Sequence, residues 1–266
     1  MNTVAKLGTA LITGASSGIG AVYADRLARR GYDLVLVARN ESRLNELAAR
    51  LAGETGRTIQ TVVADLQDGA DLHRVEQLIR DDAALTLLVN NAGVGSAAPL
   101  LQANVDTMEA MIELNVTALT RLTYAAAPAF VARGAGTIVN ISSGVAIAPE
   151  FLNGVYGATK AFVLALSQSL KHELSDKGVR IQAVLPGITR TEFWDVAGAS
   201  VDAMPAEMVM KVDDMVDAAL AGLDQGEFVT IPSLPTLDGW NAFEAARVAL
   251  VPHLSLSKPG ARYNVK

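Results

Sequence analysis

Tyr156 and Lys160 are four residues apart at the start of an apolar segment whose alanine content and length are typical of a buried helix. Positions i and i+4 of a helix share a face, so both side chains should point the same way. A free phenol has a pKa of about 10, and an ammonium that lowered it by about 3 units would supply about 4 kcal/mol. Alone, the spacing favours a surface tyrosine beside a solvated lysine. Ser143, which follows a strand-like run, shifts the balance toward a proton-transfer site.

A glycine-rich turn follows the first predicted strand, residues 9–13. Gly14 would permit the tight turn, Gly18 would let the backbone approach a pyrophosphate, and Gly20 would let the next helix pack closely. N–H groups at the start of that helix would bind the phosphates. The spacing, Gly-x-x-x-Gly-x-Gly, differs from the commoner Gly-x-Gly-x-x-Gly. A turn without a ligand is the alternative, but its place directly after a strand favours a dinucleotide site.

Arg39 follows the second predicted strand, residues 33–37, and the small Ala38. Dinucleotide folds that select NAD place an acid near this position, whereas a 2′-phosphate requires a base. The pattern therefore predicts NADP, with an ordinary surface arginine as the alternative.

Strands and helices alternate along most of the chain, which predicts an α/β fold: a single-domain, doubly wound parallel sheet of Rossmann type with helices on both faces. Further strands are expected over 58–64, 85–89, 136–141, 179–185 and 227–231, and helices over 41–51, 71–81, 105–133, 155–175 and 207–224. Gly14, Arg39, Asp65 and Asn90 then fall at the carboxyl ends of strands, where ligands bind in such sheets.

Composition narrows the class of protein. The chain has 266 residues, is 50% hydrophobic and 19% charged, and carries a net charge of −6, which argues against disorder and against a nucleic-acid surface. It has no cysteine, and its histidines, His73, His172 and His253, form no ligand cluster, so no metal is expected. No apolar run approaches the roughly 20 residues of a membrane span. Residues 7–15 are interpreted as a strand rather than a signal peptide, and we expect a cytoplasmic protein.

The ordered motifs resemble the short-chain dehydrogenase/reductase family from the first strand to about residue 231. They are Thr13-Gly-Ala-Ser-Ser-Gly-Ile-Gly20, Asn90-Asn-Ala-Gly93, Ser143, Tyr156-x-x-x-Lys160 and Pro186-Gly187. The resemblance implies that Tyr156 is the general acid/base, that Lys160 lowers its pKa and binds the nicotinamide ribose, and that Ser143 steadies the substrate oxygen. Asn115 would support a water-linked proton path to the lysine. Ser142 fits the family's spacing less well than Ser143.

The resemblance also implies a set of cofactor contacts. They are Gly14, Ser16, Ser17, Gly18, Ile19, Gly20, Arg39, Asp65, Leu66, Asn90, Asn91, Ala92, Gly93, Tyr156, Lys160, Pro186, Gly187, Thr189 and Thr191. NADP-preferring members often carry a second base where this chain has Ser17, so NADP selection should depend mainly on Arg39, aided by the Ser16 hydroxyl. Residues 232–266 match no family pattern and are treated as an extension of unknown role within one domain, 1–266, with a helix expected over 238–250.

These residues predict hydride transfer between NADP(H) and a carbonyl compound or secondary alcohol, with a non-catalytic NADP(H)-binding sensor or scaffold as the alternative. A hydrolase is disfavoured because Ser143 has no glycine elbow or histidine partner. Residues 188–204 should form a substrate loop, with Phe193 and Trp194 on one wall and Phe151 opposite. The acids of this loop predict an uncharged, medium-sized, largely apolar substrate. Surplus apolar residues in the helices over 105–133 and 155–175 predict a homodimer or homotetramer.

Overall fold

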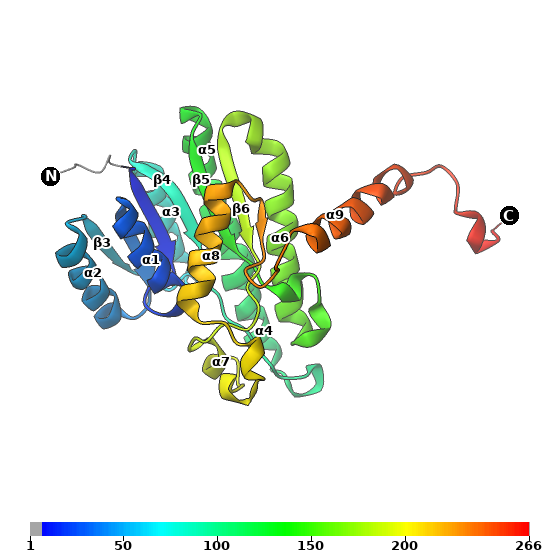
Figure 1. Cartoon of the computed structure of the whole chain (residues 1–266), viewed down its shortest axis with the longest axis horizontal. Helices are drawn as coiled ribbons and strands as arrows, with labels where there is room; N and C mark the ends of the chain where they lie inside the picture. The colour runs from blue at the N-terminus through cyan, green and yellow to red at the C-terminus, as the bar shows by residue number, and fades with distance from the viewer. Residues whose placement is uncertain (1–6, 266) are drawn as a thin grey trace. The chain divides into compact units, whose positions relative to one another are not determined.

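Seven parallel strands form the centre of the structure, a computed structural model that describes residues 7–265 (Figure 1). The strands are β1 (Thr9–Thr13), β2 (Asp33–Ala38), β3 (Ile59–Val63), β4 (Leu85–Asn90), β5 (Gly136–Ile141), β6 (Val179–Val184) and β7 (Val229–Thr230). Their order is β3-β2-β1-β4-β5-β6-β7, with every neighbouring pair parallel. The strand order reverses between β1 and β4, which places a ligand-binding switch point there. The predicted doubly wound parallel sheet is confirmed.

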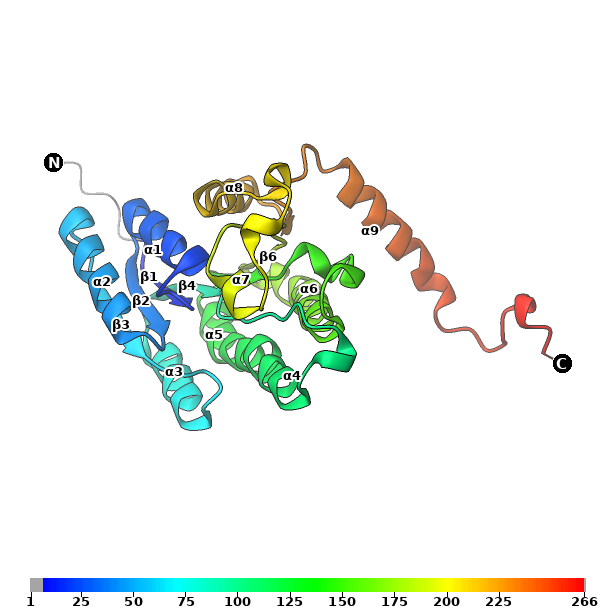
Figure 2. The same cartoon turned by 90° about the horizontal axis from the view of Figure 1, so that it is seen from below.

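Helices cover both faces of this sheet, as predicted. One face carries α1 (Gly18–Arg30), α2 (Glu41–Thr55) and α8 (Val212–Gln225), and the other carries α3 (Gly69–Asp81), α5 (Leu119–Arg133) and α6 (Gly154–Leu174). Along β1, Ala10 and Ile12 pack into the apolar core under α1, α2 and α8, and Leu11 packs into the core on the opposite face. Figure 2 shows α1 and α8 on one side of the sheet and α3 and α5 on the other. Burial of both faces explains why the central strands β1, β2 and β4 are nearly continuous apolar runs, whereas the edge strand β3 exposes Gln60 and Val63.

The helix expected over 105–133 contains a π-helical turn, Glu113–Ala118, between α4 (Val105–Ile112) and α5. Such turns are rare and frequently mark functional sites. Apolar periodicity did not reveal it because the pattern continues on both sides of the turn. The other differences are at element ends. The last strand is two residues long, and the helix expected from residue 207 begins at Val212 because Met210 instead pairs with Thr189.

The chain divides into two units, Met1–Pro232 and Ser233–Lys266. The second contains α9 (Asp238–Leu250), with the predicted bounds, followed by short 3-10 turns. Within it the ring centre of Trp240 lies 5.5 Å from that of Phe243. Whether this segment belongs to one domain with the rest stays a prediction. None of the helices within residues 7–265 has the length and hydropathy that crossing a membrane requires.

A buried carboxylate joins the helices α3 and α5. Glu76 of α3 has a side chain only 2% exposed, and it binds Arg121 of α5 through one oxygen and Arg80 through the other at 2.9 Å. Burial alone would raise the pKa of Glu76, but hydrogen bonds from Arg121 and Arg80 outweigh it and hold the pKa below its usual value. A depressed carboxyl pKa stabilises the fold above the unfolded pKa, and this contribution is lost as the pH falls through the folded pKa.

We expect Glu76→Gln to lower the free energy of unfolding at pH 7 by about 2 kcal/mol, because the amide loses two charge-assisted hydrogen bonds. The deficit relative to the unmodified protein should shrink as the pH falls below 4.5, the ordinary pKa of the carboxyl. Urea unfolding at several pH values measures both effects. Arg80→Gln is the control and should cost less, since its side chain is 48% exposed. Equal stability of Glu76→Gln and the unmodified protein at pH 7 would contradict this assignment.

Candidate active site

Tyr156 and Lys160 are both buried on α6, and the Lys160 Nζ lies 5.9 Å from the centre of the Tyr156 ring. The helix begins at Gly154 because Asn153 caps it, its side-chain oxygen accepting a hydrogen bond from the Val155 N–H at 2.9 Å. The Lys160 Nζ donates to the backbone oxygen of Ile141, the last residue of β5, at 3.0 Å. The helix and the sheet edge therefore hold this pair together.

Burial controls the proton affinities of the pair. It raises the pKa of Tyr156 to about 12, with a hydrogen bond to Ser143 acting in the opposite direction. It lowers the pKa of Lys160 to about 8, because the interior disfavours the ammonium. In the chain by itself, desolvation of the phenolate has the largest effect on the pKa of Tyr156. The expectation that Lys160 lowers the pKa of Tyr156 stays a prediction. At neutral pH the site presents a protonated phenol beside an ammonium, the form that can donate a proton.

Ser143 brings a second hydroxyl to Tyr156, with which it shares a hydrogen bond. Its Oγ lies 3.5 Å from the backbone oxygen of Pro186, which also accepts the Gly144 N–H at 2.8 Å. These contacts connect the end of β5 to the Pro186-Gly187 break after β6. Ser142 is instead buried and donates to the backbone oxygen of Lys160 at 2.7 Å. The geometry thus agrees with the choice of Ser143 over Ser142.

Asn115, in the π-helical turn, is almost fully buried and uses both ends of its amide. Its Oδ1 accepts the Val94 N–H at 2.9 Å, and its Nδ2 donates to the Val94 oxygen at 2.8 Å and to Thr159 Oγ1 at 3.1 Å. A Cβ on Gly93 would lie 3.0 Å from Asn115 Oδ1 and 3.4 Å from the Lys160 Nζ, so glycine leaves needed space there. Asn115 therefore fastens the segment after β4 to α6, while its part in a proton path stays a prediction.

The glycine turn has the backbone that its sequence requires. Gly14 and Gly18 have φ angles of 65° and 53°, a region that favours glycine. A Cβ on Gly20 would lie 2.3 Å from the Gly14 oxygen, so α1 packs directly on the turn as predicted. Ser17 precedes the first turn of α1 but makes no side-chain capping hydrogen bond. The helix start can therefore direct its N–H groups at a phosphate.

Polar groups hold this turn against β4. Thr13 Oγ1 accepts the N–H groups of Asn91 and Ala92, both at 3.0 Å. The Asn91 Nδ2 donates to the backbone oxygens of Thr13 and Gly14 at 2.9 and 3.2 Å. Asn91 thus shapes the glycine turn, and the half-buried Ser16 and Ile19 complete it. This role of Thr13 was not predicted, although its place directly before Gly14 was an available signal.

Asn90 directs its side chain into the interior. Its Nδ2 donates to Thr123 Oγ1 at 3.0 Å and to Asn140 Oδ1 at 2.9 Å, and Asn140 in turn donates to Ser167 at 3.0 Å. This buried chain of hydrogen bonds links β4, β5, α5 and α6. Any contact between Asn90 and the cofactor must therefore use its backbone.

Arg39 lies at the carboxyl edge of the sheet beside the turn after β3. Its guanidinium is 3.8 Å from the Asp65 carboxylate, and its side chain is 65% exposed. That separation exceeds a hydrogen-bond distance, so the guanidinium can reorient toward a 2′-phosphate. Leu66 is buried in the core beneath the same turn.

The predicted substrate loop contains α7 (Phe193–Val196). The Phe193 ring centre lies 5.6 Å from that of Tyr156, and the ring packs against Gly95, where a Cβ would be 2.2 Å away. Trp194 packs edge-on against Phe193 and donates its indole N–H to the Thr189 oxygen at 3.0 Å. Of the two aromatic substrate contacts predicted in this loop, Phe193 therefore faces Tyr156, and Trp194 is buried within the loop.

The beginning of this loop also approaches the glycine turn and the start of α2. The Thr191 methyl group lies 3.2 Å from the position of a Cβ on Gly18. Glu192 forms an ion pair of 2.6 Å with Arg43, in the first turn of α2. The loop thus connects the glycine turn and α2 with the surroundings of Tyr156.

A glycine turn at the switch point, a basic residue after β2 and a buried Tyr–Lys pair define a dinucleotide-dependent α/β oxidoreductase. The family model for short chain dehydrogenases matches residues 8–201. The chain therefore belongs to the short-chain dehydrogenase/reductase family, and it is an NADP-dependent oxidoreductase acting on CH–OH/C=O groups.

Several characterised proteins are similar to it over most of their length. A short-chain dehydrogenase from Sphingobium yanoikuyae, solved in complex with NADPH, is 52% identical with a TM-score of 0.92, over 95% of this chain and 98% of that one. The bulky-bulky ketone specific alcohol dehydrogenase from Comamonas testosteroni is 47% identical with a TM-score of 0.89, over 96% and 98% of the two chains. Sulfoacetaldehyde reductase 2 from Chromohalobacter salexigens is 34% identical over 89% of this chain and 98% of its own.

We expect Arg39→Ala to weaken NADPH binding about tenfold or more, because a charge-assisted hydrogen bond to the 2′-phosphate is lost, and to leave NADH binding nearly unchanged. Fluorescence titration with each dinucleotide measures both affinities. Arg43→Ala is the matched control, since that arginine is already paired with Glu192. An unchanged ratio of NADPH to NADH affinity in Arg39→Ala would refute the role of Arg39.

Proposed function

We propose that this chain uses NADPH to reduce medium-sized, uncharged, largely apolar ketones or aldehydes, and oxidises the matching secondary alcohols in reverse. The observation that carries the proposal is the pairing of the Tyr156 and Ser143 hydroxyls beside the ring of Phe193. Two oxygen-directed donors lie there in apolar surroundings, which suits a carbonyl group with apolar substituents.

The residues of the chain supply everything except the hydride, which the nicotinamide carries when bound. The Ser143 and Tyr156 hydroxyls donate hydrogen bonds to the carbonyl oxygen and stabilise the negative charge that develops on it. Tyr156, which is protonated at neutral pH, then transfers its proton to that oxygen. The Lys160 ammonium would hold the nicotinamide ribose and would stabilise the phenolate that remains.

The surroundings of Tyr156 favour apolar substituents. Tyr156 packs with Met108, Met111 and Val145, and Leu152 packs against the same cluster. Next to Leu152 is a pocket of about 400 Å³ formed by residues 97–100 and 151–154. The predicted substrate contact Phe151 is in this lining and is largely exposed.

The compared proteins act on different substrates, a bulky ketone in one case and the small anion sulfoacetaldehyde in another. The charges of the loop favour the neutral substrate for this chain. Arg190 is paired with Asp202 at 2.5 Å, and Asp195 adds negative charge beside Phe193. Rates of NADPH oxidation with a panel of neutral and anionic carbonyl compounds decide between the two substrate classes. Faster reduction of the anionic compounds would contradict the proposal.

Self-association and location in the cytoplasm stay predictions. Exposed apolar residues on the helices expected to pair, such as Val105, Tyr124 and Phe162, support a homo-oligomer.

Tyr156→Phe should reduce turnover at least about 100-fold, because the ring remains but the transferred proton is gone. NADPH binding should be nearly unchanged. The two readouts are steady-state NADPH oxidation with a neutral ketone and fluorescence titration of the cofactor. Retention of more than a few percent of the rate would remove Tyr156 from the mechanism. If the unmodified protein bound NADPH but turned over no carbonyl compound, the sensor alternative would stand instead.

A further inference from the structure

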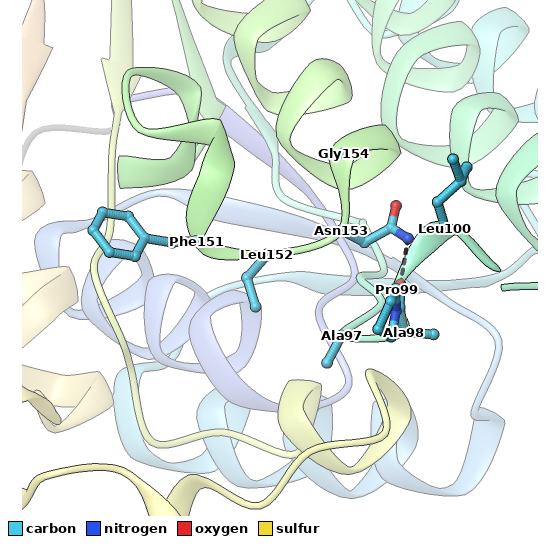
Figure 3. A pocket seen from close by; sticks show the side chains of 8 residues that line it. All are labelled: Ala97, Ala98, Pro99, Leu100, Phe151, Leu152, Asn153 and Gly154. Carbon is cyan, nitrogen blue, oxygen red and sulfur yellow. Dashed lines mark hydrogen bonds between the residues drawn. The ribbon is translucent and has the colours of Figure 1, made fainter. Parts of the chain in front are cut away.

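Two chain segments far apart in sequence form the pocket next to the apolar cluster of Tyr156, Met108, Met111 and Val145 (Figure 3). Residues 97–100 follow β4, and residues 151–154 precede α6. Neither segment is a regular helix or strand throughout, so neither has a continuous ladder of backbone hydrogen bonds to fix its position. Individual hydrogen bonds, including those from side chain to backbone, therefore help to define the width of the pocket.

Asn153 makes such a contact between the two segments. Its Nδ2 donates to the Ala98 oxygen at 2.6 Å, while its Oδ1 accepts the Val155 N–H at 2.9 Å. Figure 3 shows Asn153 between Leu152 and Leu100, with the hydrogen bond to Ala98 dashed. The side chain is buried, so a lost partner would leave a costly unpaired group. One amide thus caps the catalytic helix and fastens the opposite segment.

The fastened segment continues to the residues that contact Tyr156. The Ala97 N–H donates to the Ala197 oxygen at 2.9 Å, just after α7, and Gly95 packs against the Phe193 ring. Asn153 is the residue just before α6, and Tyr156 lies three residues further on, in the first turn of the helix. A shift of the Ala98 segment would therefore change the pocket wall on the side of Phe193.

We propose that Asn153 is a positioning residue that determines specificity: its amide fixes the Ala98 segment to the start of α6 and so shapes the pocket for a large apolar substituent of the carbonyl substrate. The inference rests on the proposed function. It predicts that loss of the Nδ2 donor affects large substrates more than small ones, because a small ketone needs only the hydroxyls of Tyr156 and Ser143.

Two variants separate the connection to Ala98 from the helix cap. Asn153→Ser keeps a good capping oxygen, but its side chain is too short to reach Ala98 as well. Asn153→Asp keeps the size and the capping acceptor and replaces the donor with an oxygen. The assay compares kcat and KM for butyrophenone and 2-butanone at saturating NADPH.

Both variants should lower kcat/KM for butyrophenone by about fivefold or more, chiefly through KM, as expected for loss of one hydrogen bond that shapes the pocket. The kcat/KM for 2-butanone and the NADPH affinity should stay near those of the unmodified protein. Equal losses for both ketones would show a merely structural cap. An effect in Asn153→Asp alone would show a charge effect. Either result, or no effect on either ketone, would overturn the proposal.

Hydrogen–deuterium exchange provides a readout that needs neither substrate nor cofactor. Asn153→Ser should speed amide exchange over residues 97–103, and unchanged exchange there would overturn the proposal. If the unmodified protein reduced neither ketone, the proposed function would fail, while the exchange result would still decide whether Asn153 fastens this segment.

Discussion

Burial of the Lys160 ammonium is the constraint on which the arrangement of the site depends. A charged group inside a protein needs close hydrogen-bond partners, and the Nζ finds one in the Ile141 oxygen at the edge of the sheet. The space around the Nζ is tight. A side chain at position 93 would crowd both the Nζ and the Asn115 amide, so glycine is required there. Ser142 completes this frame by donating to the Lys160 backbone oxygen. Strand, π turn and helix are thus positioned around one lysine.

The same burial changes how tightly the two groups hold their protons. The phenol of Tyr156 loses solvation with the lysine and holds its proton more tightly than in water. The lysine holds its proton less tightly, so near neutral pH it is close to the limit of its charged range. A site in this state is ready to donate a proton to a carbonyl oxygen. Ser143 and Phe193 then select what approaches, one by hydrogen bonding and the other by its apolar surface.

The sequence predicted the fold well because apolar strands alternate with helices and the central strands are buried on both faces. It also identified the Tyr–Lys pair and Ser143, since local spacing and order carry that information. It did not reveal the π turn at Asn115, the inward placement of Trp194 or the bond between Asn153 and Ala98. The π turn and the Asn153–Ala98 bond depend on contacts between segments distant along the chain, such as Val94 with Asn115. The placement of Trp194 depends on how its own loop folds, since its indole N–H bonds to the Thr189 oxygen. The rise in the pKa of Tyr156 that burial causes was not predicted, because spacing shows a nearby charge but not the depth of burial.

The central claim is tested most directly by the pKa of Lys160 in the folded chain. Nitrogen-15 NMR of labelled lysine side chains, with the signal assigned by its loss in Lys160→Arg, follows the titration of the Nζ. Burial predicts a midpoint at about 8, with the proton lost as the pH rises through that value. A midpoint near the ordinary 10.5 would show a solvated ammonium and contradict the account.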